Sequence, residues 1–200
     1  HDALPIWEGN FATASSQLGN YLQLQPEQTS VRLLLGKVYL NDNRPGDAEA
    51  LARSILENEA NNVEALKMLG VALALQAKHG ASADVYAQVM AIEPEDAEIH
   101  ARLGAALSRS GQHSQALDTL RAAQRTWPDD LRIRVRLVQA CLEADRRDEA
   151  ANEAADTLQS FPESSIAHTL VGQTSLARGD KQQARRSFER AEEINDSNRG

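Results

Sequence analysis

Apolar residues recur along the chain at spacings of three and four, and polar residues separate them. Leu103 and Leu107 share one helical face, and Ala116 and Leu120 share another, because a helical turn holds 3.6 residues. Gly111 lies between the two patterns, where its tolerance of a left-handed backbone favours the end of a helix. The pattern predicts two helices joined by a tight turn.

This pattern recurs every 34 residues. The recurring positions are a leucine, a glycine directly after it, a small residue in the second helix and a closing proline. They are Leu35, Leu69, Leu103, Leu137 and Val171; Gly36, Gly70, Gly104 and Gly172, with Val138 as the exception; Ala14, Ala48, Ser82, Ala116, Ala150 and Ala184; and Pro26, Pro94, Pro128 and Pro162, replaced elsewhere by Ala60 and Asp196. Small residues in two of these positions indicate that paired helices approach closely.

With these residues the chain resembles the tetratricopeptide repeat (TPR) family, whose 34-residue unit has a Leu-Gly pair, a turn glycine, an alanine and a late proline. The resemblance covers about residues 8 to 196. It implies an all-α fold, a right-handed superhelix (TPR solenoid) of helix-turn-helix hairpins. The family often has tryptophan early in the first helix, where this chain has Arg32, Leu66, His100, Arg134 and His168.

We expect a single TPR array over residues 8–198. It divides into a partial repeat, 8–28, and five full repeats, 29–62, 63–96, 97–130, 131–164 and 165–198. Residues 1–7 do not follow the register, and are either a non-native scar or a frayed natural end.

Within the partial repeat, a helix is predicted from Phe11 to Gln25, with Ala14, Leu18 and Tyr21 on its buried side. The turns inside the full repeats are predicted at 42–46, 78–80, 110–112, 145–147 and 178–180. Acidic residues or serine precede several first helices, as in Pro94-Glu95-Asp96 and Pro162-Glu163-Ser164, where they suit the exposed N–H groups.

The predicted array begins in the middle of a repeat, and at its C-terminal end it lacks the polar cap that terminal repeats need. Phe188 is expected near an apolar end face. We therefore expect either a piece of a longer array or self-association through the array ends.

The resemblance further implies that the first helices line a concave groove that holds a peptide. The candidate lining residues are Leu33, Lys37, Lys67, Val71, Ala101, Ala105, Arg132, Val135, Gln139, Thr169 and Gln173. Arg102 and Arg136 flank Arg132, and the three predict a basic spot for a partner's carboxylate. The alternative is a solvated edge neutralised by Glu64, Glu98 and Glu143.

TPR co-chaperones that grip a C-terminal carboxylate use lysine, arginine and asparagine on successive first helices. The corresponding positions here are Leu33 with Lys37, Lys67 with Val71, Ala101 with Ala105, and Val135 with Gln139. Because the asparagines are missing, a chaperone-tail clamp is disfavoured. The small apolar residues predict instead a groove for a partner's apolar helix or strand.

Charge and composition narrow the functional classes. The net charge of −8 and the pI near 5.1 argue against binding nucleic acid or anionic membranes. The single cysteine, Cys141, excludes an internal disulfide and a thiolate zinc site, and its position predicts an inert buried thiol.

No other chemistry is predicted. The histidines are not spaced as metal ligands on a helix, and the glycines form no phosphate loop. We predict no catalytic residue, metal or cofactor, no membrane span and no signal peptide in this segment.

The predicted function is a non-enzymatic protein-interaction scaffold, of bacterial type, that binds a polypeptide in its groove or assembles through its ends. The alanine-rich, aromatic-poor repeats resemble the long TPR arrays of bacterial envelope and exopolysaccharide-export systems. One alternative is the substrate-recruiting arm of a larger enzyme such as a glycosyltransferase, and another is a spacer in a larger machine. The sequence leaves open whether the protein acts in the bacterial cytoplasm or periplasm.

Overall fold

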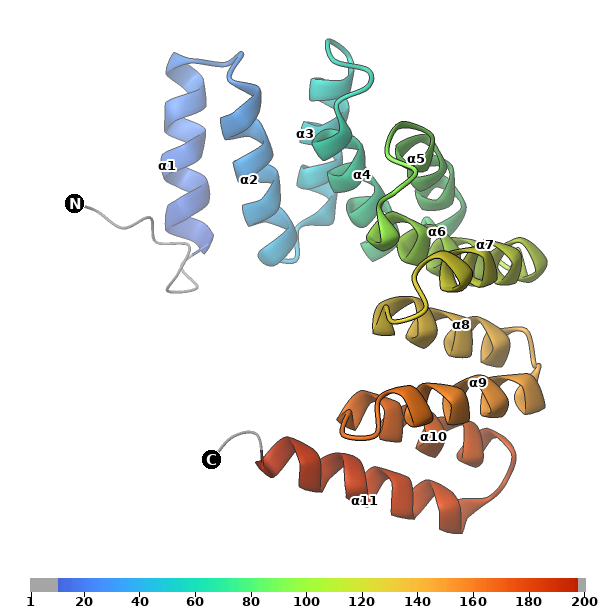
Figure 1. Cartoon of the computed structure of the whole chain (residues 1–200). Helices are drawn as coiled ribbons and strands as arrows, with labels where there is room; N and C mark the ends of the chain where they lie inside the picture. Colours follow the sequence, from blue (N-terminus) through green and yellow to red (C-terminus); the bar gives the residue numbers. More distant parts are fainter. Residues whose placement is uncertain (1–10, 198–200) are drawn as a thin grey trace. The chain divides into compact units, whose positions relative to one another are not determined.

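The computed structural model describes residues 11–197, and all regular structure in that range is α-helical (Figure 1). The helices are α1 (Phe11–Leu24), α2 (Thr29–Asn41), α3 (Pro45–Leu56), α4 (Val63–Leu75), α5 (His79–Ile92), α6 (Ala97–Arg109), α7 (His113–Thr126), α8 (Leu131–Glu143), α9 (Arg147–Ser160), α10 (Ser165–Ala177) and α11 (Lys181–Ser197). The all-α fold of helix-turn-helix hairpins is confirmed. The predictions for residues 1–7, for residues 8–10 of the partial repeat and for residue 198 lie outside the described residues.

The helices repeat with the sequence period. First helices begin at Thr29, Val63, Ala97, Leu131 and Ser165, and second helices begin at Pro45, His79, His113, Arg147 and Lys181, so that each start lies 34 residues after the previous one of its kind. The chain forms two compact units, divided in the sequence between Pro94 and Glu95. The first unit contains α1 to α5 and the second contains α6 to α11.

One residue with a left-handed backbone lies within the connection inside each hairpin. These residues are Asn43 (φ 54°), Ala77 (φ 59°), Gly111 (φ 83°), Asp145 (φ 56°) and Gly179 (φ 86°). The role predicted for Gly111 is therefore confirmed. The predicted turns at 42–46 and 78–80 extend too far, because Gly46 and Gly80 lie inside α3 and α5. The chain reverses earlier, at Asn43 and Ala77, although neither is glycine.

Side chains cap the first helices at four joints between repeats. The side-chain oxygens of Asn62, Asp96, Asp130 and Ser164 accept hydrogen bonds from the backbone N–H groups of Ala65, Glu98, Arg132 and Ala167, respectively. Each bond satisfies an N–H group that has no partner inside the helix. The capping predicted at Asp96 and Ser164 is thus confirmed.

Many TPR proteins have tryptophan early in the first helix. In this chain Arg134 and His168 occupy that position, and their side chains contact the preceding repeat. Arg134 donates from Nε to the carbonyl of Pro128 at 2.7 Å, and its guanidinium lies over the ring of Phe161. One period later, His168 Nε2 lies 3.0 Å from the carbonyl of Pro162. Both side chains therefore bind the closing proline of the preceding repeat, a contact made with a polar group instead of an indole.

Glycine and a bulky side chain form the closest contact between the helices of three hairpins. A Cβ atom on Gly104 would lie 2.5 Å from Leu120 Cδ2, and one on Gly70 would lie 2.7 Å from the Tyr86 ring. Both large side chains are almost fully buried. The recurrent glycine therefore provides the space that the large side chain of the second helix fills.

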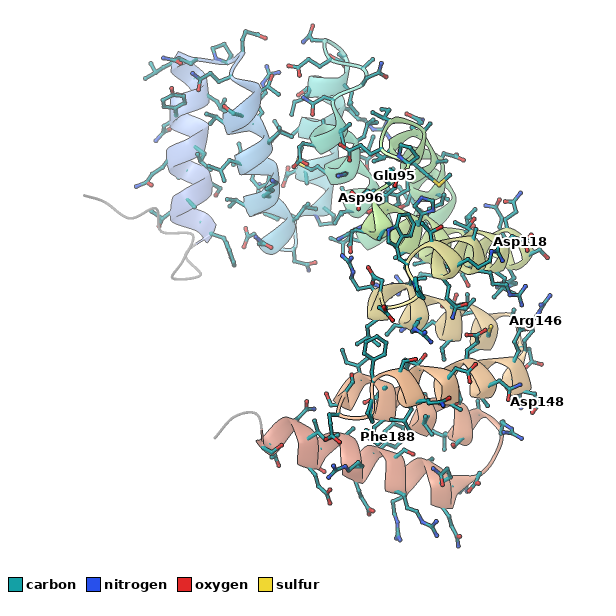
Figure 2. The ribbon with its side chains drawn as sticks, in the orientation of Figure 1. Glu95, Asp96, Asp118, Arg146, Asp148 and Phe188 are labelled. Carbon is teal, nitrogen blue, oxygen red and sulfur yellow. The ribbon has the colours of Figure 1, made fainter. Side chains whose placement is uncertain are left out.

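Phe188 takes part in the same contact in the last hairpin. Its ring lies between α10 and α11, and a Cβ atom on Gly172 would lie 2.6 Å from it (Figure 2). Phe188 is nevertheless 37% exposed, so the expectation of an apolar residue near the end face agrees with the structure, although one edge of the ring packs on Gly172 inside its own hairpin. The exposed side of α11 carries polar residues, among them Gln182, Arg185 and Glu189.

In the hairpin of α8 and α9, the larger side chain is on the first helix and the smaller one is on the second. Val138 occupies the glycine position, and Ala154 occupies the position of Leu120 one period later. Both residues are fully buried and belong to one hydrophobic cluster. The exception to the glycine pattern is therefore matched by a smaller partner on the second helix.

The first helix departs from its predicted pattern. Ala14 is buried, but Tyr21 is 41% exposed and its hydroxyl donates to Gln25 Oε1 at 3.1 Å. The prediction of a buried Tyr21 is wrong. In the described residues α1 packs mainly on α2, and one neighbouring helix covers only part of its apolar face.

Glu49 joins α3 to the connection between α4 and α5. Its Oε1 accepts from Arg53, and its Oε2 accepts from Gln76 Nε2 at 2.8 Å and from Lys78 Nζ at 2.9 Å. These bonds, with that from Lys78 first, lower the pKa of the carboxyl from 4.5 to about 2. Because the charged form is favoured in the folded state, the bonds contribute stability only while Glu49 is ionised.

The first unit is accordingly expected to lose stability at low pH through Glu49. Its contribution is fully present above about pH 4.5 and disappears as the pH falls toward 2, because the folded-state pKa is the lower one. Glu49→Gln should lower the free energy of unfolding by about 1–2 kcal/mol at neutral pH and by much less near pH 2. Urea denaturation at several pH values measures this loss. Glu57→Gln is the control, because the Glu57 side chain is exposed and lies outside this hydrogen-bond network; an equal effect at both sites would contradict the assignment.

Candidate functional site

The first helices form one side of each unit. In the second unit α6 contacts α8 and α8 contacts α10, whereas among the described residues no comparable contact joins α7 to α9 or α9 to α11. In the first unit α2 contacts α4, again without a comparable contact between α3 and α5 in the described range. First helices are therefore closer together than second helices, and we call the side that they form the inner face of each unit.

The predicted groove residues of the first unit have mixed exposure. Lys37 is exposed, and its Nζ lies 3.2 Å from Glu64 Oε2. Lys67 is half-buried, with its Nζ 2.7 Å from Glu93 Oε2. Leu33 and Val71 are half-buried. The two lysines are thus neutralised by acidic residues of the same unit.

In the second unit one predicted groove residue, Ala101, is buried and cannot contact a bound partner. Ala101 is buried in a cluster with Ala123 and Ile133, so its assignment to the groove surface is wrong. It faces the second helix of its own hairpin and the following repeat. The remaining predicted residues keep some exposure: Ala105, Val135, Gln139 and Thr169 are half-buried and Gln173 is exposed.

The three arginines of the predicted basic spot differ in their partners. Arg102 Nε lies 2.6 Å from Glu98 Oε1, and Arg132 contacts both Glu98 and Asp130 at 2.6 Å. Asp130 is the main cause of the raised pKa of Arg132, so this guanidinium is firmly paired. Of these three arginines, only Arg136 has no ion pair with another residue of the range 11–197. Of the predicted neutralising residues, Glu98 therefore pairs with Arg102 and Arg132. Glu143 accepts a hydrogen bond from Ser108 instead of pairing with an arginine.

A small hollow lies between α6 and α8 beside Arg136. Its lining residues are Ala105, Ser108, Arg109, Arg136, Gln139, Ala140 and Glu143. The structure therefore brings together three residues that the sequence had assigned to the groove, Ala105, Arg136 and Gln139.

Arg109 belongs to this hollow and was not predicted from the sequence. It is exposed at the end of α6, and no ion pair or hydrogen bond of its side chain is found in the described part of the chain. The signal was present, because Arg109 lies four residues after Ala105 and seven after Arg102, on the same helical face. Ser108 was missed as well, since a buried serine beside Glu143 has no sequence signature.

The electrostatics of Arg136 reflect this setting. Partial burial lowers the pKa of its guanidinium, and the positive charges of Arg109 and Arg102 lower it further. Its Nη1 donates to Gln139 Oε1 at 2.9 Å. The carboxylates of Glu98 and Glu143 act in the opposite direction and raise this pKa, although neither lies within ion-pair distance of the guanidinium.

The remaining candidate chemistry is structural. Cys141 is buried, and burial raises the pKa of its thiol to about 11, which agrees with the predicted inert thiol. Residues 11–197 contain no group of three or more His, Cys, Asp or Glu side chains that could hold a metal ion. In the same range, no helix combines the length and the apolar character needed to cross a membrane.

The chain belongs to the tetratricopeptide repeat family. The family model matches residues 8–73 and 109–174, which together make up more than half of the chain. The predicted family is therefore confirmed. No curated protein sequence matches the chain.

Solved TPR structures share the fold. MamA 41-end from Desulfovibrio magneticus RS-1 is 22% identical, with a TM-score of 0.68 over 86% of this chain and 97% of that one. YrrB, a TPR protein with an unusual peptide-binding site, is 18% identical, with a TM-score of 0.63 over 90% of this chain and 93% of that one. At these identities the likeness establishes the solenoid fold and not a shared ligand.

Proposed function

We propose that the chain is a non-catalytic protein-interaction scaffold that binds a polypeptide on the inner face of its hairpins. The observation that carries this proposal is the inner face of α6 and α8, where Ala105, Val135 and Gln139 stay partly exposed around a small hollow. Small side chains let the backbone of a bound segment approach closely. The unusual peptide-binding site of YrrB supports the same use of this fold.

The exposed groups of the inner face suit a polypeptide better than a small metabolite. Half-buried Val135 offers an apolar surface, while Gln139 offers an amide that donates and accepts hydrogen bonds. Peptide backbones need both kinds of group when they bind as a strand or helix. In the first unit, Leu33 and Val71 continue the apolar character on that unit's own inner face.

Selection from a short-peptide library tests this proposal. The full chain is expected to enrich peptides that it binds, and Ala105→Trp should weaken binding by about tenfold or more by covering the inner face between α6 and α8. Ala122→Trp is the matched control, because Ala122 is exposed on α7, a second helix. Fluorescence anisotropy of an enriched peptide measures both variants. A library that yields no binder, or equal losses in the two variants, would overturn the proposal.

The setting that we propose is a bacterial envelope or exopolysaccharide-export assembly. Its support is compositional, since the repeats are rich in alanine and only 4% of residues are aromatic. Reading the gene on both sides of this segment tests the setting. A lipid-attachment cysteine upstream with further repeats downstream would support it, whereas an adjoining catalytic domain would make the chain a recruiting arm of an enzyme.

A further inference from the structure

We propose that Arg109 and Arg136, which line the small hollow between α6 and α8, bind an internal acidic side chain of the polypeptide partner at its mouth. This inference rests on the proposed function and adds the chemistry of the partner. The site lies entirely within the second unit, on that unit's inner face.

Ion pairing distinguishes these two arginines from the other cations of the inner face. Lys37, Lys67, Arg102 and Arg132 each lie within 3.2 Å of a carboxylate oxygen. Arg109 and Arg136 have no carboxylate oxygen within 4.0 Å in the described residues, yet they are close enough for Arg109 to lower the pKa of Arg136. The carboxylates of Glu98 and Glu143 offset part of this repulsion at Arg136, but neither forms an ion pair with Arg136 or Arg109.

The guanidinium of Arg136 retains most of its hydrogen-bonding capacity. One donor is used by Gln139 Oε1, at 2.9 Å, which leaves further N–H groups of the planar fork available. Partial burial makes a charged partner more favourable than it would be for an exposed side chain. Arg109, at the exposed rim, adds a second cation that an incoming anion meets first.

The charge balance of the hollow fits a carboxylate. Two arginines and the carboxylate of Glu143 sum to one positive charge, which a single carboxylate neutralises and a phosphate dianion would exceed. Arginine also binds carboxylates through two parallel hydrogen bonds. Because the whole chain carries a charge of −8, a partner with one acidic residue among neutral ones would be repelled less than a strongly acidic segment.

The pair is not a product of the repeat. One period before and after Arg109 the chain has Leu75 and Glu143, whereas the position of Arg136 holds Arg102 one period earlier and Leu170 one period later, so that the pair occurs once although one of its members recurs. A consensus feature of the fold would recur at these positions. The two arginines therefore mark one place in the second unit, as a specific anchor requires.

The test uses peptides enriched from the same library, synthesised with blocked ends so that no terminal carboxylate is present. We expect the enriched peptides to share one Asp or Glu, whose replacement by Asn or Gln weakens binding by about tenfold. Arg136→Gln and Arg109→Gln should each weaken binding of the acidic peptide. In either variant, the acidic peptide and its amide analogue should bind almost equally, as expected when both partners of one interaction are removed.

Arg125→Gln is the matched control, because Arg125 is exposed on α7 and has no side-chain partner in the described residues. The exposed Arg109 keeps the test informative if Arg136→Gln fails to fold. Enriched peptides without an acidic residue, or an undiminished preference for the acidic peptide in both variants, would overturn the anchor. Binding that Ala105→Trp abolishes but both arginine variants leave intact would reject the anchor and retain the proposed function, and displacement by inorganic phosphate alone would show a free-anion site instead.

Discussion

Replacement of Gly104 by leucine is expected to destabilise the second unit by about 1–3 kcal/mol. A Cβ atom at this position would lie 2.5 Å from Leu120 Cδ2, well inside normal contact distance. Leu120 is fully buried and has no free space into which to move. The two helices of the hairpin would have to separate, with loss of the packing between α6 and α7.

Gly80→Leu is the matched control for this substitution. Gly80 lies in the first turn of α5, its φ is not positive, and a Cβ atom there would meet nothing within 4 Å beyond the adjacent backbone of its own helix. Leucine there should leave stability unchanged or raise it by up to about 1 kcal/mol, because glycine is a poor helix former. Urea denaturation followed by circular dichroism compares the two variants. Equal destabilisation would mean that the close contact at Gly104 does not carry the effect.

Ala154→Leu is expected to have an effect of similar size, about 1–3 kcal/mol, in the next hairpin. The substitution restores the leucine that the preceding repeat has at Leu120, but here it would meet Val138 instead of glycine. Val138 and Ala154 are both fully buried, so that the added atoms have no room. A residue that suits one repeat should therefore damage its neighbour.

The rescue variant makes this prediction specific. Val138→Gly should recover part of the stability that Ala154→Leu loses, since the pair would then have the sizes of Gly104 and Leu120. By itself, Val138→Gly should destabilise, through a cavity and a helical glycine. The coupling free energy from a double-mutant cycle measures the rescue. Strictly additive effects would show that the two positions do not share one packing space.

Much of the fold could be predicted from the sequence, because the period fixes several positions at once. The 34-residue spacing of glycines, alanines and leucines led to the hairpins, and the helix starts have the same spacing. The predicted turn positions were wrong where the residue type alone was considered and the surrounding residues were not. Gly80 was assigned to a turn because glycine favours turns, but Ala77 adopts the left-handed conformation and Gly80 is helical.

The candidate site was less predictable than the fold. Helical spacing assigned Ala105, Arg136 and Gln139 to the inner face, and the structure places them around one hollow, but spacing could not tell which cations are already paired. Pairing depends on whether a side chain reaches across to another helix, as Lys37 does to Glu64 and Arg132 does to Glu98. Spacing along one helix contains no information on such contacts.

The sequence by itself determined the family, the all-α hairpins and the small positions at which helices meet, because these follow from a period that every repeat obeys. The tertiary structure decided which exceptions compensate one another and which charges remain available. Val138 is tolerated because Ala154 is small, and Glu98 pairs with Arg102 and Arg132, whereas no ion pair of Arg136 is found in the described residues. Both results depend on distances between side chains of different helices, which only packing sets.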